Sequence, residues 1–213
     1  LNAQNSILNP TLISHFKNNS DKFLGYDSFG YSYQITNNVF SKIKGKEIFE
    51  YKNVSLGKIT KASILDDINR IEENSLDAIT LWHVFEHIEN QDEMLSTFHG
   101  KLKEKGILVI AVPNPTSYDA KHYKEYWAAY DVPRHIYHFT KKGMENLITK
   151  KPNWKLRKIK PLVLDSYYIS MLSEKYQKSS LFWLKAIIFG TISNVKALFS
   201  NEFSSLIYII EKR

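Results

Sequence analysis

The pentapeptide His83-Val-Phe-Glu-His87 places two imidazoles and a carboxylate within five residues. On a helix, this H-x-x-E-H pattern puts both histidines on one face, where they can bind zinc while the glutamate acts as a general base. One hypothesis from the spacing is therefore a zinc metalloprotease. The pentapeptide directly follows a strand-like run and has no long flanking helix to offer a third ligand, so a structural role for the histidines is the competing interpretation.

A second concentration of reactive side chains lies between Tyr118 and Phe139. This segment holds five of the 13 tyrosines, three of the seven histidines and one tryptophan. It has neither a clear strand pattern nor a clean helical one. Amphipathic rings gathered in an irregular segment indicate a lid or a pocket wall rather than a plain connector.

Two apolar runs predict the strands that position these residues. Asp77–Trp82 and Ile107–Val112 are short, apolar and rich in β-branched residues, as expected of buried parallel strands. Between them, Asn90 and Glu93 predict a helix N-terminus, and Gly106 predicts the end of that helix. Its apolar stripe comprises Met94, Leu95, Phe98 and Leu102. A strand-helix-strand unit makes the two strands parallel, and ligands then bind beyond their carboxyl ends, around Trp82–His87 and Pro113–Tyr118.

Weaker patterns predict the remaining elements. Strand candidates are Lys22–Gly25, Lys46–Tyr51, Ile59–Leu65, Lys155–Lys160 and Ser205–Ile210, and Tyr33–Lys44 is compatible with a helix. The apolar positions of Leu181–Phe199 recur at helical spacing. Lys185, Asn194 and Lys196 argue against a spanning helix, so a core or homodimer-interface helix is expected, with peripheral membrane contact as the second interpretation.

Composition sets the outer bounds. A chain of 213 residues fits one domain, and the absence of cysteine excludes disulfides, thiolate catalysis and cysteine-ligated metals. With no signal-peptide pattern in Leu1–Pro10, a cytoplasmic protein is expected.

Charge is distributed unevenly along the chain. The total is +7, made up of −2 over residues 1–106 and +9 over residues 107–213, with eight basic residues against Glu145 in Lys141–Lys160. The excess predicts an anionic partner or a solvated surface. A small or lipid-linked acceptor is favoured over nucleic acid, because no groove-reading helix or interleaved aromatic pattern accompanies the basic residues.

Three blocks in order resemble a known family. Asp77-Ala-Ile-Thr-Leu-Trp-His-Val-Phe-Glu-His-Ile88, Gly106-Ile-Leu-Val-Ile-Ala-Val-Pro-Asn114 and Tyr130-Asp-Val-Pro-Arg-His-Ile-Tyr-His-Phe-Thr140 resemble S-adenosylmethionine-dependent methyltransferases of the Rossmann-like class, in the bacterial group related to ubiquinone-biosynthesis O-methyltransferases. Ser204–Lys212 resembles the family's final strand. The resemblance is strong over residues 77–140 and looser beyond.

The resemblance implies an α/β fold with a doubly wound, mostly parallel seven-stranded sheet, an aromatic lid segment and C-terminal helical elaboration. The whole chain, 1–213, is then one methyltransferase domain. Its cofactor half spans about 20–115, and its substrate and lid elements span about 116–150 and 165–203. The implied cofactor is S-adenosyl-L-methionine.

The family's glycine-rich turn has no clear counterpart. Asp27 and Gly30 in Phe23–Tyr31 are the best match, because a cofactor needs close backbone approach. Glu50, at the end of a candidate second strand, can accept the ribose hydroxyls, and Asp66 can accept from the adenine amino group. Trp82 and His83 are expected to line the cofactor pocket. Either the cofactor site is degenerate, or a segment with the turn lies outside this chain.

The resemblance also places the Pro-Arg-His-x-Tyr-His-Phe block toward the substrate. His135 is then the candidate base for an oxygen nucleophile, and Arg134 can hold an anionic group. The alternative is that both residues only fix the lid through backbone hydrogen bonds. Trp127, Tyr130 and His138 are candidate substrate-binding residues.

Glu86 and His87 can ligate a divalent ion, but no metal site is expected. The sequence thus predicts O-methylation of a small or lipid-linked acceptor. A non-catalytic binding module with a degenerate cofactor site is the alternative, and the metalloprotease is the third.

Overall fold

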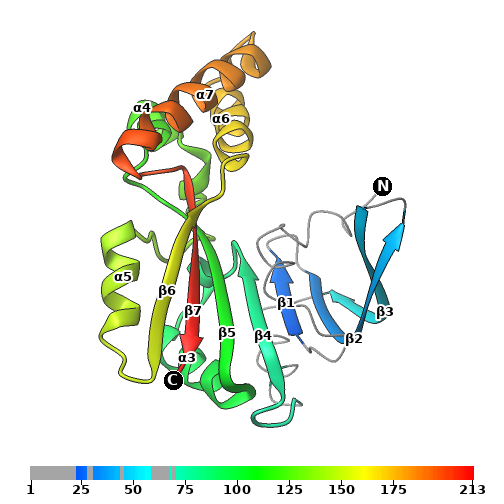
Figure 1. Cartoon of the computed structure of the whole chain (residues 1–213). Coiled ribbons are helices and arrows are strands. Elements are labelled where there is room, and N and C mark those ends of the chain that lie inside the picture. The colour runs from blue at the N-terminus through cyan, green and yellow to red at the C-terminus, as the bar shows by residue number, and fades with distance from the viewer. Residues whose placement is uncertain (1–22, 28–30, 44–45, 59–67, 69–70) are drawn as a thin grey trace.

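The computed structural model describes residues 23–27, 31–43, 46–58, 68 and 71–213. Its seven strands form one sheet in the order β3-β2-β1-β4-β5-β7-β6 (Figure 1). The strands are β1 (Phe23–Asp27), β2 (Tyr31–Ile43), β3 (Lys46–Lys58), β4 (Leu76–Trp82), β5 (Leu102–Pro113), β6 (Trp154–Pro161) and β7 (Ser205–Lys212). The helices are α3 (Gln91–Lys101), α4 (Tyr118–Tyr123), α5 (Lys141–Thr149), α6 (Asp165–Tyr176) and α7 (Phe182–Ser200).

The centre of the sheet is parallel and its flanks are antiparallel. β1 pairs with β4, and β4 with β5, in parallel, which confirms the predicted strand-helix-strand unit. The four other described pairings are antiparallel, so the expectation of a mostly parallel sheet holds only in the centre. Only residues 28–30 and 44–45 separate β1, β2 and β3, and connections this short permit antiparallel pairing but no crossover. The α/β class is confirmed.

The helix expected over Tyr33–Lys44 is wrong. Residues 33–43 lie in β2, which pairs with β3 from Tyr31 opposite Lys58 to Ile43 opposite Lys46, and Lys44 lies outside the described residues. The segment is rich in Tyr, Ile, Thr, Val and Phe, which favour strands, and this preference outweighs the weak helical spacing. The strand expected over Ile59–Leu65 lies outside the described residues.

The helix between β4 and β5 begins as predicted but ends earlier. The Asn90 side chain accepts a hydrogen bond from the Glu93 amide, and Met94, Leu95 and Phe98 are buried. α3 ends at Lys101, and Gly106 lies inside β5 instead of capping the helix. A Cβ on Gly106 would lie 2.8 Å from the Lys103 carbonyl oxygen, so glycine is required there by close backbone approach.

Three helices gather beyond the carboxyl ends of β5 and β6, at the top of Figure 1. α6 and α7 pack closely at Gly190. A Cβ atom at this position would lie only 3.0 Å from the Tyr167 Cα atom, so a larger residue would push the two helices apart. The buried Asp119 of α4 joins the group, accepting hydrogen bonds from Trp127 Nε1 (2.8 Å), Ser193 Oγ (2.6 Å) and Ser204 Oγ (2.6 Å). This three-donor carboxylate fixes the helices to the end of the sheet.

Candidate active site

The carboxyl ends of three strands meet at one edge of the sheet. Asp27 of β1 is in register with Trp82 of β4, and Trp82 with Ala111 of β5. A cavity of about 500 Å³ lies beyond this edge. His83 and Pro113 line it from the strand ends, and α6 lines it from the helical side. The volume falls within the range of small-molecule sites, and the place is where open α/β sheets bind ligands.

His83 is held as a cation by two carboxylates. It follows β4 with φ of 53°, a left-handed conformation that non-glycine residues adopt rarely. Its Nε2 atom lies 2.9 Å from Asp165 Oδ2, and its Nδ1 atom lies 3.5 Å from Glu86 Oε1. Burial by itself lowers the pKa of His83, but the two carboxylates outweigh burial and raise this pKa to about 10. His83 is therefore protonated at neutral pH and cannot serve as a base.

His135 has the opposite protonation. Its Nδ1 atom lies 2.8 Å from the Ala129 carbonyl oxygen, and because a carbonyl only accepts, Nδ1 carries the proton and Nε2 keeps a lone pair. Burial lowers the pKa of His135, and the Glu86 carboxylate offsets only part of that effect. His135 lines the cavity. A neutral imidazole with a free, oriented Nε2 is the state that a general base requires.

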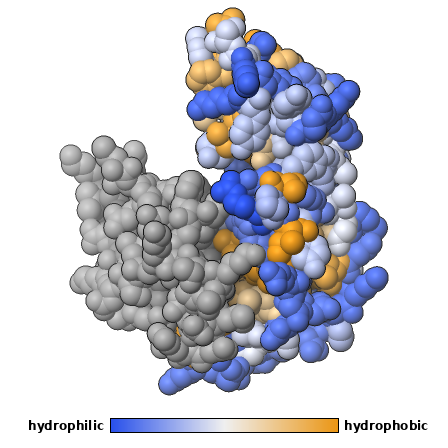
Figure 2. Space-filling view, turned by 180° about the vertical axis from the view of Figure 1, so that it is seen from behind, coloured by the Kyte–Doolittle hydropathy of each residue, from blue (hydrophilic) through white to orange (hydrophobic). Residues whose placement is uncertain are grey.

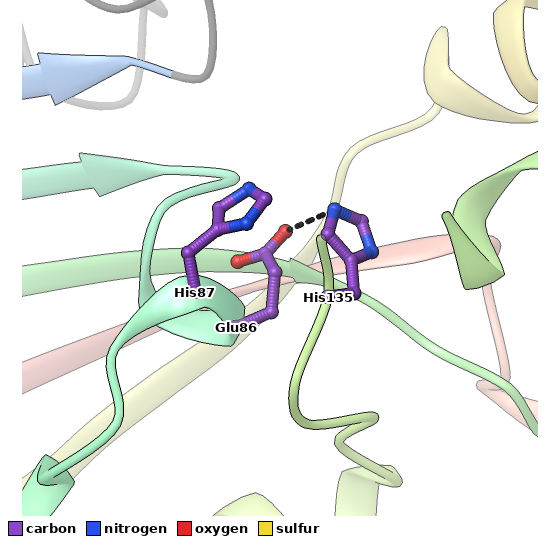
Figure 3. Close-up of side chains that lie close together, drawn as sticks. All are labelled: Glu86, His87 and His135. Atoms are coloured by element: carbon purple, nitrogen blue, oxygen red, sulfur yellow. Dashed lines mark ion pairs between the residues drawn. The ribbon is translucent and has the colours of Figure 1, made fainter. Parts of the chain in front are cut away.

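Glu86 lies between two histidines (Figure 3). Neither of its buried carboxylate oxygens forms a hydrogen bond with a described residue, and His135 Nε2 is 3.8 Å from Oε1. The Nδ1 atom of His87 lies 2.8 Å from the Arg134 carbonyl oxygen, so Nδ1 is the donor of that hydrogen bond and Nε2 is the ring nitrogen left to face other groups. One ligand atom from each of Glu86, His87 and His135 lies within 4.8 Å of the others. With both histidine tautomers fixed by backbone carbonyls, these atoms can hold a divalent cation.

The H-x-x-E-H pentapeptide does not form the helix that a zincin needs. His83 directly follows the strand β4, whereas His87 lies in the 3-10 turn Phe85–His87. His83 pairs with Asp165, and the cluster that can hold a cation recruits His135 instead. The metalloprotease hypothesis is therefore wrong, because His83 has a left-handed backbone conformation outside any helix and does not share a helical face with His87.

The predicted substrate residues lie away from the cavity lining. Trp127 is buried and donates to Asp119, so it belongs to the packing of the helices. Tyr130 packs edge-on against Trp127, and the Nε2 atom of His138 bonds the Tyr130 carbonyl oxygen (2.9 Å). Arg134 does line the cavity, but its guanidinium pairs with Asp131 at 2.6 Å. The structure thus brings His83, Arg134 and His135 together at the cavity, while the three predicted substrate residues stabilise its surroundings.

The predicted cofactor residues fall into three groups. Asp27 and Trp82 share the carboxyl edge of the sheet. Glu50 lies inside the edge strand β3, opposite Val39, and not at the expected strand end, because β3 continues to Lys58. Gly30 and Asp66 lie outside the described residues.

Sequence reasoning missed Asp165 and Asp131. Asp165 reaches His83 from 82 residues further along the chain, at the start of α6. Asp131 was overlooked beside Arg134, although its three-residue separation places it within reach; its Oδ2 atom also lies 3.8 Å from His135 Nε2. No local sequence pattern marks Asp165 as a site residue, since only the fold brings α6 to the end of β4.

A family model described as a methyltransferase domain matches residues 11–158. The chain belongs to this methyltransferase domain family, which confirms the expected class of enzyme. The family assignment supports S-adenosylmethionine as the cofactor. No curated protein matches the chain.

Solved methyltransferase structures are similar at low identity. Phosphoethanolamine N-methyltransferase 2 of Haemonchus contortus, solved with phosphomonomethylethanolamine and S-adenosylhomocysteine, is 16% identical with a TM-score of 0.39. A possible histamine N-methyltransferase of Thermotoga maritima is 11% identical with a TM-score of 0.42. The match covers 68% of this chain in both cases, and 35% and 59% of the two chains respectively. This chain thus corresponds to only part of either protein.

One observation at the carboxyl edge fits a bound cofactor. The Trp82 indole nitrogen is buried, and no described residue forms a hydrogen bond with it. Buried donors in folded proteins are almost always satisfied, so this one fits an acceptor atom supplied by a ligand. Asp27, in register beside Trp82, adds a carboxylate position to the same edge.

Proposed function

We propose that the protein methylates a hydroxyl group of a small or lipid-linked acceptor bound in the cavity at the carboxyl edge. The observation that carries this proposal is His135, a neutral imidazole whose Nε2 lone pair is oriented by the Ala129 carbonyl. A neutral amine has less need of a base at this position, because its lone pair can attack before it loses a proton. An oxygen acceptor gains from one, since its proton must leave as the new bond forms.

S-adenosylmethionine, when bound, supplies a methyl group on a sulfonium that becomes a neutral thioether. His135 Nε2 takes the hydroxyl proton as the acceptor oxygen forms its bond to the methyl carbon. Glu86, 3.8 Å away, stabilises the imidazolium that results. Arg134 binds an anionic group of the acceptor by exchanging its contact with Asp131. The aromatic segment Tyr118–Phe139 excludes water as a lid, and alignment supplies most of the rate.

A divalent cation at Glu86, His87 and His135 is the competing arrangement. The three ligand atoms within 4.8 Å favour it, and so does the buried Glu86 carboxylate, which forms no hydrogen bond within normal distance to any described residue. In that arrangement His135 is a ligand, and the cation lowers the pKa of the acceptor hydroxyl. The two arrangements exclude each other, because a single lone pair on Nε2 cannot serve both.

The proposal includes a relationship to ubiquinone-biosynthesis O-methyltransferases. Its rival is a binding module that has lost cofactor affinity. Release of S-adenosylhomocysteine is measured from the protein, S-adenosylmethionine and a panel of catechols, phenols and sugar alcohols, with and without EDTA. Turnover that survives EDTA supports His135 as the base, and turnover lost with EDTA and restored by Mg²⁺ supports the cation. Cofactor binding with no oxygen acceptor methylated, but with amines methylated, contradicts O-methylation.

A further inference from the structure

α7 carries its large apolar residues on the outside. The residues that α7 buries are the small ones: Ala186, Gly190, Ser193 and Ala197. Large apolar residues point outward, with Leu198 69% and Phe199 86% exposed. The exposed set, here called the outer face, comprises Leu184, Ile187, Ile188, Val195, Leu198 and Phe199. The expected core helix is therefore wrong, because the contact with α6 selects small side chains.

The outer face is continuous along the helix. At 100° per residue, its six members lie within one sector directly opposite the buried small residues. Part of the apolar surface is visible as orange atoms over the helices at the top of Figure 2. A monomer in water rarely leaves so long an apolar stripe uncovered.

The charges around the outer face indicate what covers it. The structure describes residues 163–200 throughout, and the exposed charged residues there are Lys175, Lys178, Lys185 and Lys196. The two acids in this range do not face solvent freely: Asp165 pairs with His83, and the buried Glu174 carboxylate lies 3.8 Å from the half-exposed Lys185 ammonium. Four exposed lysines without an exposed acid attract an anionic surface, and they would repel the lysines of a second copy.

Aromatic rings add a further lipid signature. Tyr168, Tyr176 and Trp183 are each about half exposed on α6 and α7. Tyrosine and tryptophan rings favour the boundary between hydrocarbon and water, where one end is apolar and the other hydrated.

α7 is long enough to cross a bilayer, but hydrogen bonds hold it against the rest of the protein. Phe182–Ser200 is the one described helix that passes this test of length and composition. Ser193 donates to the buried Asp119 at 2.6 Å, and Asn194 Nδ2 donates to the Val163 carbonyl at 3.0 Å. A spanning orientation would break both bonds and leave Asp119 with one donor fewer. α7 is therefore suited to lie along a surface.

We propose that the outer face of α7 docks on the surface of an anionic phospholipid bilayer. The apolar residues enter the boundary of the acyl chains while the lysines contact the headgroups. Tyr168 and Tyr176 also line the cavity, so docking brings the cavity close to the lipid. The role of docking in bringing the cavity close to a lipid-linked acceptor rests on the proposed function, whereas binding of the outer face to vesicles does not.

Flotation of the full chain with vesicles tests the proposal. We expect binding to vesicles that contain phosphatidylglycerol, weaker binding to pure phosphatidylcholine, and loss of binding at high salt. The double variant L198E/F199E should bind about tenfold or more weakly, since two large apolar side chains no longer enter the lipid. V132E is the matched control, because Val132 is 73% exposed but lies outside α7. Circular dichroism verifies that all variants are folded.

Three outcomes would overturn the proposal. The first is no binding to anionic vesicles at low salt, and the second is equal binding by L198E/F199E and the parent. The third is a dimer in analytical ultracentrifugation that L198E/F199E dissociates, which would assign the outer face to a second copy. Binding of S-adenosylhomocysteine, measured on the same samples, separates a failure of docking from a failure of the proposed function.

Discussion

Two histidines at the cavity differ in protonation because their neighbours differ. His83 contacts the carboxylates of Asp165 and Glu86, which hold it as a cation. His135 is turned by the Ala129 carbonyl and kept neutral by burial. The division of roles follows: His83 supplies a fixed positive charge, and His135 supplies a lone pair.

Replacing His135 with glutamine should reduce turnover by about 10²–10³-fold, because a general base contributes that order of rate. Binding of S-adenosylhomocysteine should stay within a factor of about 2–3 of the parent, the ordinary spread for an untouched site. Steady-state kinetics and calorimetry measure the two effects. His138→Gln is the matched control, since His138 is an exposed histidine of the same segment that does not line the cavity and whose Nε2 atom bonds the Tyr130 carbonyl oxygen. Equal turnover in the parent and the His135 variant would remove His135 from the mechanism.

The His83–Asp165 pair makes stability depend on alkaline pH. A histidine whose folded pKa is raised from 6.5 to about 10 contributes stability that is fully present below pH 6.5 and is lost as pH rises toward 10. Asp165→Asn removes the nearer carboxylate, so the variant should be less stable at pH 6 by a few kcal/mol, on the order expected for a broken buried pair.

Denaturant unfolding between pH 6 and pH 10 checks this pH dependence, and the difference between parent and Asp165→Asn should narrow toward pH 10. Proton NMR of His83 should give a lower pKa in Asp165→Asn. A stability curve with the same slope in both proteins would disprove the coupling.

At the scale of elements, strand register separates Asp27 from Glu50. Asp27 ends β1 beside Trp82, whereas Glu50 lies inside the edge strand β3. Asp27→Asn should therefore weaken binding of S-adenosylmethionine by about tenfold or more, the cost of one charge-assisted hydrogen bond. Glu50→Gln should change it much less. Calorimetric titration measures the affinity of both variants for S-adenosylmethionine. A larger loss of affinity in Glu50→Gln than in Asp27→Asn would show that the cofactor lies toward β3.

Asp119 holds the helical group to the sheet, so its loss should be costly. Asp119→Ala leaves three buried donors without an acceptor and should lower the free energy of unfolding by roughly 3 kcal/mol. Asp92→Ala is the control, because Asp92 is exposed and pairs with Lys151, a contact worth about 0–1 kcal/mol. Urea denaturation measures both variants. Similar losses at the two positions would mean that Asp119 does not organise the helices.

Elements with a strong local signal could be predicted from the sequence. The buried strands Leu76–Trp82 and Leu102–Pro113 and the Asn90 cap follow from apolar runs and a capping pair. β2 was not predicted, because its local pattern is compatible with a helix as well as a strand. Its pairing with β3 decides between the two, and a pairing partner cannot be recognised from the segment alone. The inner and outer faces of α7 were inverted for a similar reason, since periodicity gives a stripe but not the side that packs.

The candidate site was predictable only where motif and position agreed. His83 and His135 came from short patterns and from the family resemblance, and both line the cavity. Asp165 could not be found, because its contact with His83 depends on the path of the chain through β6. Trp127 was misread, since an aromatic residue's type does not reveal that its indole binds a buried carboxylate.

The whole molecule combines a sheet edge suited to a cofactor with a basic helical group suited to an anionic partner. The +9 charge of residues 107–213 belongs to the half that contains α5, β6, α6 and α7. Residues 11–158 match the methyltransferase domain, whereas α6 and α7 lie beyond the matched range. α6 nevertheless reaches the site, because Asp165 pairs with His83 and Tyr168 lines the cavity, so residues beyond the matched range contribute to it.

Calorimetric titration of the full chain with S-adenosylmethionine and S-adenosylhomocysteine tests the central claim most directly. A working methyltransferase should bind both with one site per chain and micromolar affinity, and this binding should not depend on vesicles. Absence of binding by a protein shown to be folded would contradict the account and favour a binding module that has kept the fold without its cofactor.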